Sequence, residues 1–207
     1  CRKLRLQRGE RFLDIGCGWG ALLLHAAQHF GVRAHGITLS ARQLEHARHR
    51  IAAAGLQGRV TVDLCDYRDL PPQACFDKIA SVGMFEHVGR RNDGAFHQSM
   101  AAALKRDGLM LLHTIGSAET THRTDAWIDR YIFPGGRLPS ATQLCQGIEG
   151  QFLIEDWESF GQDYETTLRA WWANFDAAWP ALRDDIGADF YRFWRYYLLS
   201  CAGYFRS

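Results

Sequence analysis

Three alternating glycines follow an aspartate near the start of the chain. Residues 13–20 read LDIGCGWG, and this run joins a short apolar segment to a helical pattern. Glycine lets a backbone approach a bulky ligand closely and adopt φ values that side chains disfavour. The spacing is not the G-x-G-x-x-G of dinucleotide sites, and no Lys-Ser or Lys-Thr pair follows as in a P-loop. A glycine loop beside Asp14 without phosphate-binding residues favours S-adenosylmethionine, which has no phosphate; a turn that binds no ligand is the alternative.

Polar residues also follow the second and third apolar runs of the chain. Thr38 and Gln43 follow the second run, where they could bond the ribose hydroxyls of such a cofactor, although capping and solvent exposure explain them equally well. Asp66 follows the third run and could accept a hydrogen bond from the adenine amino group, while Tyr67 could lie against the ring face. Ligands of open parallel sheets bind beyond the carboxyl ends of the strands, so these residues are expected to converge with the glycine loop.

Three further segments place polar residues in apolar surroundings. They carry Glu86 in GMFEHV, His113 in LLHTIG and Tyr164 in FGQDY. Glu86 and His113 each follow or end an apolar run, so we expect both at the same sheet edge as the glycine loop. Taken one at a time, each is a satisfied structural polar group; taken together beside a sulfonium site, they indicate acid–base chemistry.

Short apolar runs alternate with helical patterns over the first 115 residues. Ser40 is suited to cap a helix and Gly55 to end it. The patterns predict strands at 11–15, 33–38, 60–64, 79–82 and 109–115, and helices at 21–30, 40–54 and 93–104. Such alternation predicts an α/β fold with a doubly wound, mostly parallel sheet flanked by helices, a Rossmann-like arrangement.

The alternation of strand and helix patterns ends after residue 116. Residues 117–139 form a long irregular stretch, which is typical of a lid or binding segment. Residues 152–157 could form another strand. The last third is rich in aromatic residues at helical spacing, which predicts a core first and a cover over an apolar ligand as the alternative. Because no repeat or linker is evident, we expect one domain over residues 1–207.

Composition narrows the class of protein. The net charge of +1 over 207 residues gives no support to a nucleic-acid binder driven by bulk charge. The six cysteines form no C-x-x-C pair, so we expect no metal site and free thiols in a reducing cytoplasm. No apolar run approaches the length of a membrane-spanning helix. A basic cluster is either a solvated edge or a contact for an anionic membrane surface: Arg2, Lys3, Arg5, Arg8 and Arg11.

Eight motifs resemble one family in the order in which that family carries them. They cover nearly the whole chain: LDIGCGWG, TLSARQ, DYRDL, SVGMFEHVG, LLHTIGS, YIFPGGRLPS, EDWESFGQDY and CAGYFR. The family is that of the cyclopropane-fatty-acyl-phospholipid synthases. The resemblance implies transfer of a methylene group from S-adenosylmethionine to the cis double bond of an unsaturated phospholipid acyl chain.

The resemblance also implies roles for individual residues. Bicarbonate would be held as the base by the side chains of Glu86, His113 and Tyr164 and by the backbone amide of Ile115. Cys201 matches a cysteine that is counted as catalytic in the family. The cofactor would be bound by residues in three segments, namely Leu13, Asp14, Ile15, Gly16, Cys17, Gly18, Trp19, Gly20 and Ala21, then Thr38, Leu39, Ser40 and Gln43, then Asp66 and Tyr67.

The proposed chemistry requires a dry pocket. Methyl transfer to an alkene leaves a carbocation that water would quench, and aromatic faces stabilise such a cation. Tyr131, Phe133 and Trp171 are candidates for this role. We expect the substrate at the membrane surface and a cytoplasmic protein attached peripherally to the inner face of the cell membrane. A homodimer is one option for its assembly, and the oligomeric state stays open.

Two other functions stay open. A C-methyltransferase on the same fold would make a methyl-branched lipid or act on a small molecule, and would not need the set of Glu86, His113 and Tyr164. Because the family's upstream segment is absent before Cys1, the chain is expected to be truncated. A truncated, non-catalytic module that binds cofactor or lipid is therefore the third function.

Overall fold

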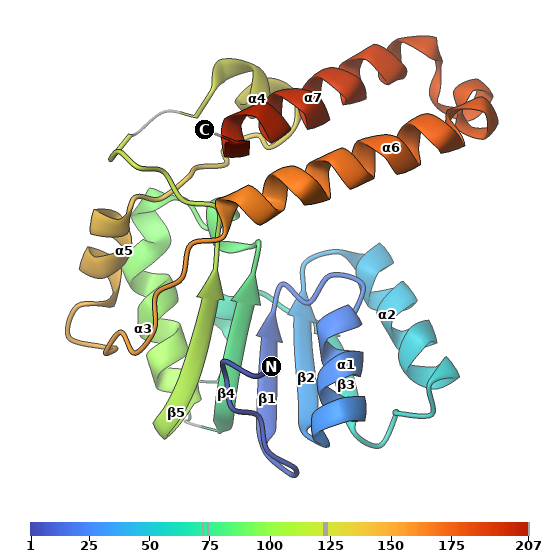
Figure 1. Ribbon diagram of the computed structural model, residues 1–207. Helices are drawn as coiled ribbons and strands as arrows, with labels where there is room; N and C mark the ends of the chain where they lie inside the picture. The colour runs from blue at the N-terminus through green and yellow to red at the C-terminus, as the bar shows by residue number, and fades with distance from the viewer. Residues whose placement is uncertain (72, 74, 122–123, 207) are drawn as a thin grey trace. The chain divides into compact units, whose positions relative to one another are not determined.

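The first part of the chain builds a parallel sheet (Figure 1). The computed structural model describes residues 1–71, 73, 75–121 and 124–206. Within these residues, the sheet has five strands in the order β3-β2-β1-β4-β5, and every neighbouring pair is parallel. The strands are β1 (Arg11–Ile15), β2 (Arg33–Thr38), β3 (Val60–Leu64), β4 (Phe76–Val82) and β5 (Leu104–His113).

Helices cover both faces of this sheet. The helices are α1 (Ala21–Phe30), α2 (Ala41–Ala53) and α3 (Asp93–Ala103). Alternate strand residues point to opposite faces, so Phe12 packs with α1 and α2 while its neighbour Leu13 packs with α3. The predicted doubly wound α/β fold is confirmed, and the strand order reverses between β1 and β4, where such folds bind ligands.

Three predicted strand boundaries differ from the structure, one of them being the end of β5 at His113 rather than at residue 115. β4 begins at Phe76 rather than at residue 79, and β5 begins at Leu104, directly after α3, rather than at residue 109. Leu104 pairs with Phe76 and Leu109 with Lys78, so three extra residues bulge out of β5 between the two pairs. Asp107 has a positive φ of 46° in this bulge, which explains why the local sequence has the character of a turn.

The strand predicted at residues 152–157 is wrong. The structure has no strand between residues 152 and 160, all of which are described. Phe152 packs against the sheet core on the α3 side, but Leu153 is 93% exposed and Ile154 is half exposed. A strand needs a neighbouring strand to satisfy its backbone groups, and this segment has none.

The two ends of the irregular segment that follows β5 contact each other. Ser117 and Ser140 form an isolated parallel bridge, and the Ser117 amide donates to the Pro139 carbonyl at 2.9 Å. One short helix, α4 (Ala126–Tyr131), lies within the segment. Helix α5 (Ala141–Ile148) follows with a capping box between Ser140 and Gln143. The prediction of a long irregular stretch is confirmed outside α4, although its residues 122–123 lie outside the described part.

Residues 154–207 form a second compact unit, and residues 1–153 form the first. Two long helices, α6 (Gly161–Ile186) and α7 (Ala188–Arg206), are joined by Gly187 and pack along each other (Figure 1). Leu168, Leu198 and Ala202 are fully buried between them, and aromatic side chains surround this centre. The aromatic pattern therefore forms a core, while the single-domain assignment stays a prediction. Among the described helices, none has the length and apolar character needed to cross a bilayer.

Candidate cofactor and acid–base site

The glycine loop leaves β1 at the point where the strand order reverses. Gly16, Gly18 and Gly20 all have positive φ values, of 73°, 53° and 78°. A Cβ atom at Gly16 would lie 2.8 Å from Cγ of Met84, which follows β4. The Gly16 amide donates to the Ile37 carbonyl of β2 at 3.0 Å. The loop is thus fixed between the ends of β2 and β4, and its backbone conformation requires glycine.

A fourth glycine, in the neighbouring strand β2, packs closely against this loop. A Cβ atom at Gly36 in β2 would lie 2.8 Å from Sγ of Cys17 and would collide with the side chain of Leu23 in α1. Gly36 therefore lets α1 and the loop pack closely on the sheet. The sequence analysis did not identify this residue, although a glycine inside a strand pattern is a signal of close backbone approach.

Asp14 is a buried carboxylic acid in β1. Only 3% of the residue is exposed, and burial raises its pKa to about 7. Among the described residues, none donates a hydrogen bond to this carboxyl group or forms an ion pair with it. Burial raises the pKa of the neighbouring Cys17 thiol to about 12, and the Asp14 charge adds to that effect. A positively charged ligand beside the loop would stabilise the ionised form of Asp14.

Helix α2 holds the glycine loop from its outer side. Arg50 donates from Nη1 to the carbonyl oxygen of Trp19 at 2.8 Å, and His46 packs edge-on against the Trp19 ring at 5.2 Å. Trp19 itself is half exposed. Arg50 and His46 were not identified from the sequence, because helical charged residues usually mark a solvated face.

The turn after β2 is ordered by its own side chains. Ser40 caps α2 by accepting from the Gln43 amide at 3.3 Å, as predicted. Thr38 donates to the side-chain oxygen of Gln43 at 2.7 Å and accepts from the Ser40 amide at 3.2 Å. Leu39 is strongly exposed at the turn. Thr38 and Gln43 are therefore close together at the sheet edge, and their contact with a ribose stays a prediction.

The carboxylate of Asp66 is held by Arg68. It accepts from Nε and Nη2 of Arg68 at 2.9 and 2.7 Å and also from the Arg68 amide at 2.9 Å. The hydrogen bond from the Arg68 guanidinium lowers the pKa of Asp66. The ring of Tyr67 packs edge-on against Phe96 of α3 at 5.2 Å. An adenine amino group would have to share Asp66 with Arg68, a residue that the sequence analysis did not identify.

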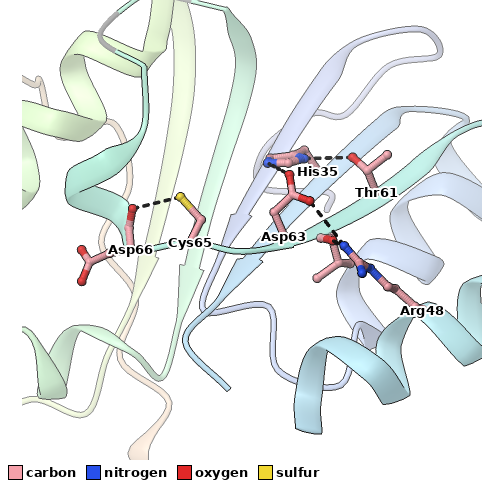
Figure 2. Close-up of polar contacts among 7 residues, drawn as sticks. His35, Arg48, Thr61, Asp63, Cys65 and Asp66 are labelled. Carbon is pink, nitrogen blue, oxygen red and sulfur yellow. Dashed lines mark hydrogen bonds and ion pairs between the residues drawn. The ribbon is translucent and has the colours of Figure 1, made fainter. Parts of the chain in front are cut away.

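A polar network fixes the strand that leads to Asp66, as Figure 2 shows. His35 contacts Thr61 at 2.9 Å through Nδ1 and Asp63 at 3.7 Å through Nε2, and Asp63 pairs with Arg48 of α2 at 3.6 Å. Arg48 also donates to the carbonyl oxygen of Val62 at 3.0 Å. Burial lowers the pKa of His35. The network ties α2 and β2 to β3 and thereby positions the turn that begins at the carboxyl end of β3.

Glu86 and Ile115 meet at the ends of β4 and β5. Glu86 lies in a 3-10 turn (Phe85–His87) and is buried; its Oε1 accepts a hydrogen bond from the Ile115 amide at 2.8 Å. Its Oε2 is buried and has no hydrogen-bond partner within the described part of the chain. The Gly83 amide donates to the carbonyl oxygen of His113 at 3.0 Å, and His113 is in register with Val82. The structure therefore brings Glu86, Ile115 and the end of the His113 strand together.

Tyr164 and Cys201 belong to the second compact unit. The Tyr164 ring lies in the first turn of α6 and packs edge-on against Phe205 at 4.9 Å and Trp171 at 6.0 Å. Cys201 of α7 is half-buried in the same aromatic core. Burial raises the pKa of Tyr197 beside them. Both residues have a packing role within this unit, and their catalytic roles stay predictions.

The other aromatic candidates differ in their surroundings. Phe133 packs edge-on against His87, next to Glu86, at 5.5 Å. Tyr131 is half exposed and has the guanidinium of Arg130 5.2 Å from its ring centre. Of the described residues, no group of three or more His, Cys, Asp or Glu could hold a metal ion.

Comparison with known proteins identifies close relatives. The family model for mycolic acid cyclopropane synthetase matches residues 1–207. The chain is 49% identical over 207 residues to the cyclopropane-fatty-acyl-phospholipid synthase of Escherichia coli (strain K12), covering 100% of the chain and 53% of that protein. It is 38% identical over 211 residues to the tuberculostearic acid methyltransferase UfaA1 of Mycobacterium tuberculosis, covering 98% of the chain and 48% of that protein.

The structure agrees with these sequence matches. It superimposes on a crystal structure of the mycolic acid cyclopropane synthase CmaA1 complexed with SAH and CTAB with a TM-score of 0.89 and 32% identity. That match covers 99% of this chain and 76% of the other. The chain spans about half the length of the curated relatives it matches.

Proposed function

Because the chain belongs to the mycolic acid cyclopropane synthetase family, we propose that its protein is an S-adenosylmethionine-dependent enzyme that modifies lipid acyl chains. It transfers a methylene group to the cis double bond of an unsaturated phospholipid and forms a cyclopropane ring. The buried carboxylate of Glu86, with one oxygen unpaired at the strand-order reversal, carries this proposal. The 49% identity to the Escherichia coli synthase supports the lipid substrate.

The first unit offers a fitting site for S-adenosylmethionine, which supplies an electrophilic methyl group. The glycine loop leaves open space at Gly18, where a Cβ atom would meet no atom of the described chain, so a ligand can approach the backbone there. Asp14 offers a buried carboxylate that a cationic ligand would complement. Thr38 and Gln43 would bond the ribose, and Asp66 would accept from the adenine while Tyr67 packs against it. The remaining contacts would come from Leu13, Ile15, Cys17, Gly18, Trp19, Gly20, Ala21, Leu39 and Ser40.

The acid–base residues would complete the reaction on the acyl chain. Methyl transfer leaves a carbocation on the acyl chain, and loss of a proton from the added methyl group closes the ring. A bound bicarbonate would supply the proton acceptor beside this carbon. Glu86 and Tyr164 would hold this anion through hydrogen bonds, and His113 would pass the proton onward. Because the Ile115 amide already donates to Glu86, it would have to share its hydrogen between that carboxylate and the anion.

The substrate would be reached at a membrane surface. The exposed rings of Tyr131 and Phe133 support this proposal, since aromatic side chains favour the interface between lipid and water. The two rings would also exclude water from the carbocation on the acyl chain. We further propose that the protein works in the cytoplasm on the inner face of the cell membrane.

A lipid assay tests the proposed function. The protein that carries this chain is incubated with S-adenosylmethionine, bicarbonate and vesicles of phospholipid with cis-monounsaturated chains. We expect acyl chains that gain the mass of one CH2 and resist hydrogenation under conditions that saturate an alkene. Glu86→Gln should lower product formation about tenfold or more, because it disturbs the anion site, while the Kd for S-adenosylhomocysteine stays within about twofold of wild type.

Two outcomes would contradict the proposal. One is the absence of any mass gain, which favours a module that only binds cofactor or lipid. The other is full turnover by Glu86→Gln, which removes Glu86 from the acid–base machinery.

A methyl-branched product is the second candidate. The 38% identity to the tuberculostearic acid methyltransferase UfaA1 favours it. The same assay separates the two products, because an unsaturated branched chain takes up hydrogen while a cyclopropane chain does not. A small-molecule substrate would leave the phospholipids unchanged and still consume S-adenosylmethionine when that substrate is added.

A further inference from the structure

A largely buried ion pair contacts the segment that carries Glu86. Asp93, in the first turn of α3, pairs with the guanidinium of Arg137, which follows α4. Only 14% of the Asp93 side chain and 16% of the Arg137 side chain are exposed. An ion pair that is largely removed from water loses hydration, so its value often lies in specifying one arrangement rather than in stability.

Arg137 contacts the Glu86 segment in two more ways. Its backbone N–H donates to the carbonyl oxygen of Glu86 at 3.0 Å. Its guanidinium carbon lies 5.5 Å from the centre of the ring of Phe85, which is fully buried. A cation over an aromatic face attracts the ring. Arg137 therefore fixes both Glu86 and the residue before it.

The acidic partner of Arg137 is itself held in place. Nδ1 of His97 donates to the carbonyl oxygen of Asp93 at 2.9 Å, and the His97 ring contacts Phe85 at 5.3 Å. Burial lowers the pKa of His97, which favours the neutral ring. A Cβ atom at Gly147 in α5 would lie 3.0 Å from this ring, so α5 closes over it. Asp93 thus has a fixed position relative to the segment that Arg137 contacts.

The direction of the Glu86 carboxylate depends on this support. Oε1 is fixed by the Ile115 amide, and the buried Oε2 has no partner among the described residues. With Oε1 fixed, the position of the Glu86 backbone decides where Oε2 points. That backbone accepts a hydrogen bond from Arg137, and it lies in a 3-10 turn that begins at Phe85, shortly after β4 ends at Val82.

We propose that Arg137, through its ion pair with Asp93, is a positioning residue that directs the Glu86 carboxylate at the reacting groups. The catalytic importance of this role rests on the proposed function, in which Glu86 holds the proton-accepting anion. The positioning of the Glu86 carboxylate can itself be measured, both in the resting protein and through its effect on turnover.

The first test measures hydrogen exchange of the Ile115 amide by NMR in the protein that carries this chain. We expect Arg137→Met to speed this exchange about tenfold, because the Glu86 carboxylate moves away from the amide. Arg137→Lys, which keeps the charge without the planar fork, should give an intermediate rate. Arg130→Met is the matched control: its guanidinium lies in the same segment, over the exposed Tyr131, and the exchange should not change.

The second test measures turnover. Arg137→Met should lower kcat about tenfold while the Kd for S-adenosylhomocysteine stays within about twofold, a split that general destabilisation does not produce. In a Glu86→Gln background, Arg137→Met should add less than about twofold to the loss, because it acts through Glu86.

Unchanged exchange at Ile115 in Arg137→Met, or losses that multiply in the double variant, overturn the proposal. If Arg137→Met does not fold, Arg137→Lys decides by the same two criteria. If the wild-type protein modifies no lipid while the exchange responds as expected, the proposed function fails and the positioning role remains.

Discussion

At the scale of single residues, the loop glycines have similar backbone angles but different surroundings. Gly16 faces the side chain of Met84, whereas a Cβ atom at Gly18 would meet open space. Alanine at Gly16 would therefore overlap the chain itself, whereas crowding of a bound cofactor by alanine at Gly18 stays a prediction. We expect Gly16→Ala to raise the Kd for S-adenosylhomocysteine about tenfold or more, measured by calorimetry, because both strain and overlap act there.

Gly55→Ala is the matched control for backbone strain. Gly55 also has a positive φ, of 66°, with open space around it, and it lies at the end of α2. Gly18→Ala and Gly55→Ala should each lower the free energy of unfolding by about 1 kcal/mol. An equal loss of affinity in Gly16→Ala and Gly55→Ala would rule out a local effect of Gly16 on the loop.

Asp14 gives the chain a distinct pH dependence. Its pKa is raised by burial from 3.8 to about 7 in the folded chain. The folded state therefore holds this proton more tightly than the unfolded chain does. The stability associated with it is fully present below about pH 4, falls as the pH rises to 7, and then stays level. Asp14→Asn removes this slope, which is at most about 1.4 kcal/mol per pH unit.

Urea unfolding at pH 5 and at pH 7.5 tests the effect of Asp14. The difference in unfolding free energy between Asp14→Asn and wild type should shift in favour of the variant as the pH rises. The comparison cancels the titration of other groups. A difference that does not change with pH would mean that Asp14 is ionised in the folded chain throughout this range.

The sequence predicts the residues that could touch a ligand better than those that hold them in place. The glycine loop, the Ser40 cap and the nearness of Glu86 to Ile115 follow from motif and strand order. Arg137 does not, because its partner Asp93 is distant in sequence and is brought to it only in the folded chain.

At the scale of elements, β1, α1, β2 and β3 have the bounds that the sequence predicts. Their periodicity is regular, and glycine or a capping residue marks their ends. The errors arise where local and tertiary signals disagree. The bulge of β5 has a turn-like sequence but pairs with β4 on both sides. Residues 152–157 have a strand-like pattern but no neighbouring strand.

The Ser140 hydroxyl group supports the point where the segment from Ser117 to Ser140 closes on itself. Ser140 accepts from the Gln143 amide at 3.3 Å and contacts the hydroxyl of Thr120 at 2.8 Å. We expect Ser140→Ala to lower the free energy of unfolding by about 1–2 kcal/mol through loss of the cap. Limited proteolysis should cut this segment faster in the variant.

Thr167→Ala serves as the control for Ser140→Ala. Thr167 donates to the Asp163 carbonyl on the exposed side of α6, and its loss should change stability by less than about 0.5 kcal/mol. Equal protease sensitivity of wild type and Ser140→Ala would show that the bridge at Ser117 closes the segment without the cap.

At the scale of the whole molecule, the two compact units differ in how much core they contain. In the second unit, Leu168, Leu198 and Ala202 form the fully buried centre, whereas the sheet unit has two extensive buried clusters, one on each face. A small core supports little stability by itself. We expect amide exchange in residues 161–206 to be faster than in β1 and β4, as measured by mass spectrometry.

The variant Leu198→Ala tests whether the second unit unfolds independently of the first. Leu198 is fully buried between α6 and α7, and its truncation should cost about 2–4 kcal/mol. Exchange should then accelerate across residues 161–206 while β1 and β4 keep their protection. Uniform acceleration across the whole chain would mean that both units open together.

The bridge between Ser117 and Ser140 has a consequence for how this fold can diversify. Since Ser117 and Ser140 pair there, the segment between the two serines begins and ends at one place, shortly after β5. Insertions, deletions and aromatic replacements in this segment, away from Arg137, should leave the ends of β4 and β5 undisturbed. The length and aromatic content of this segment can therefore vary independently of the parallel sheet.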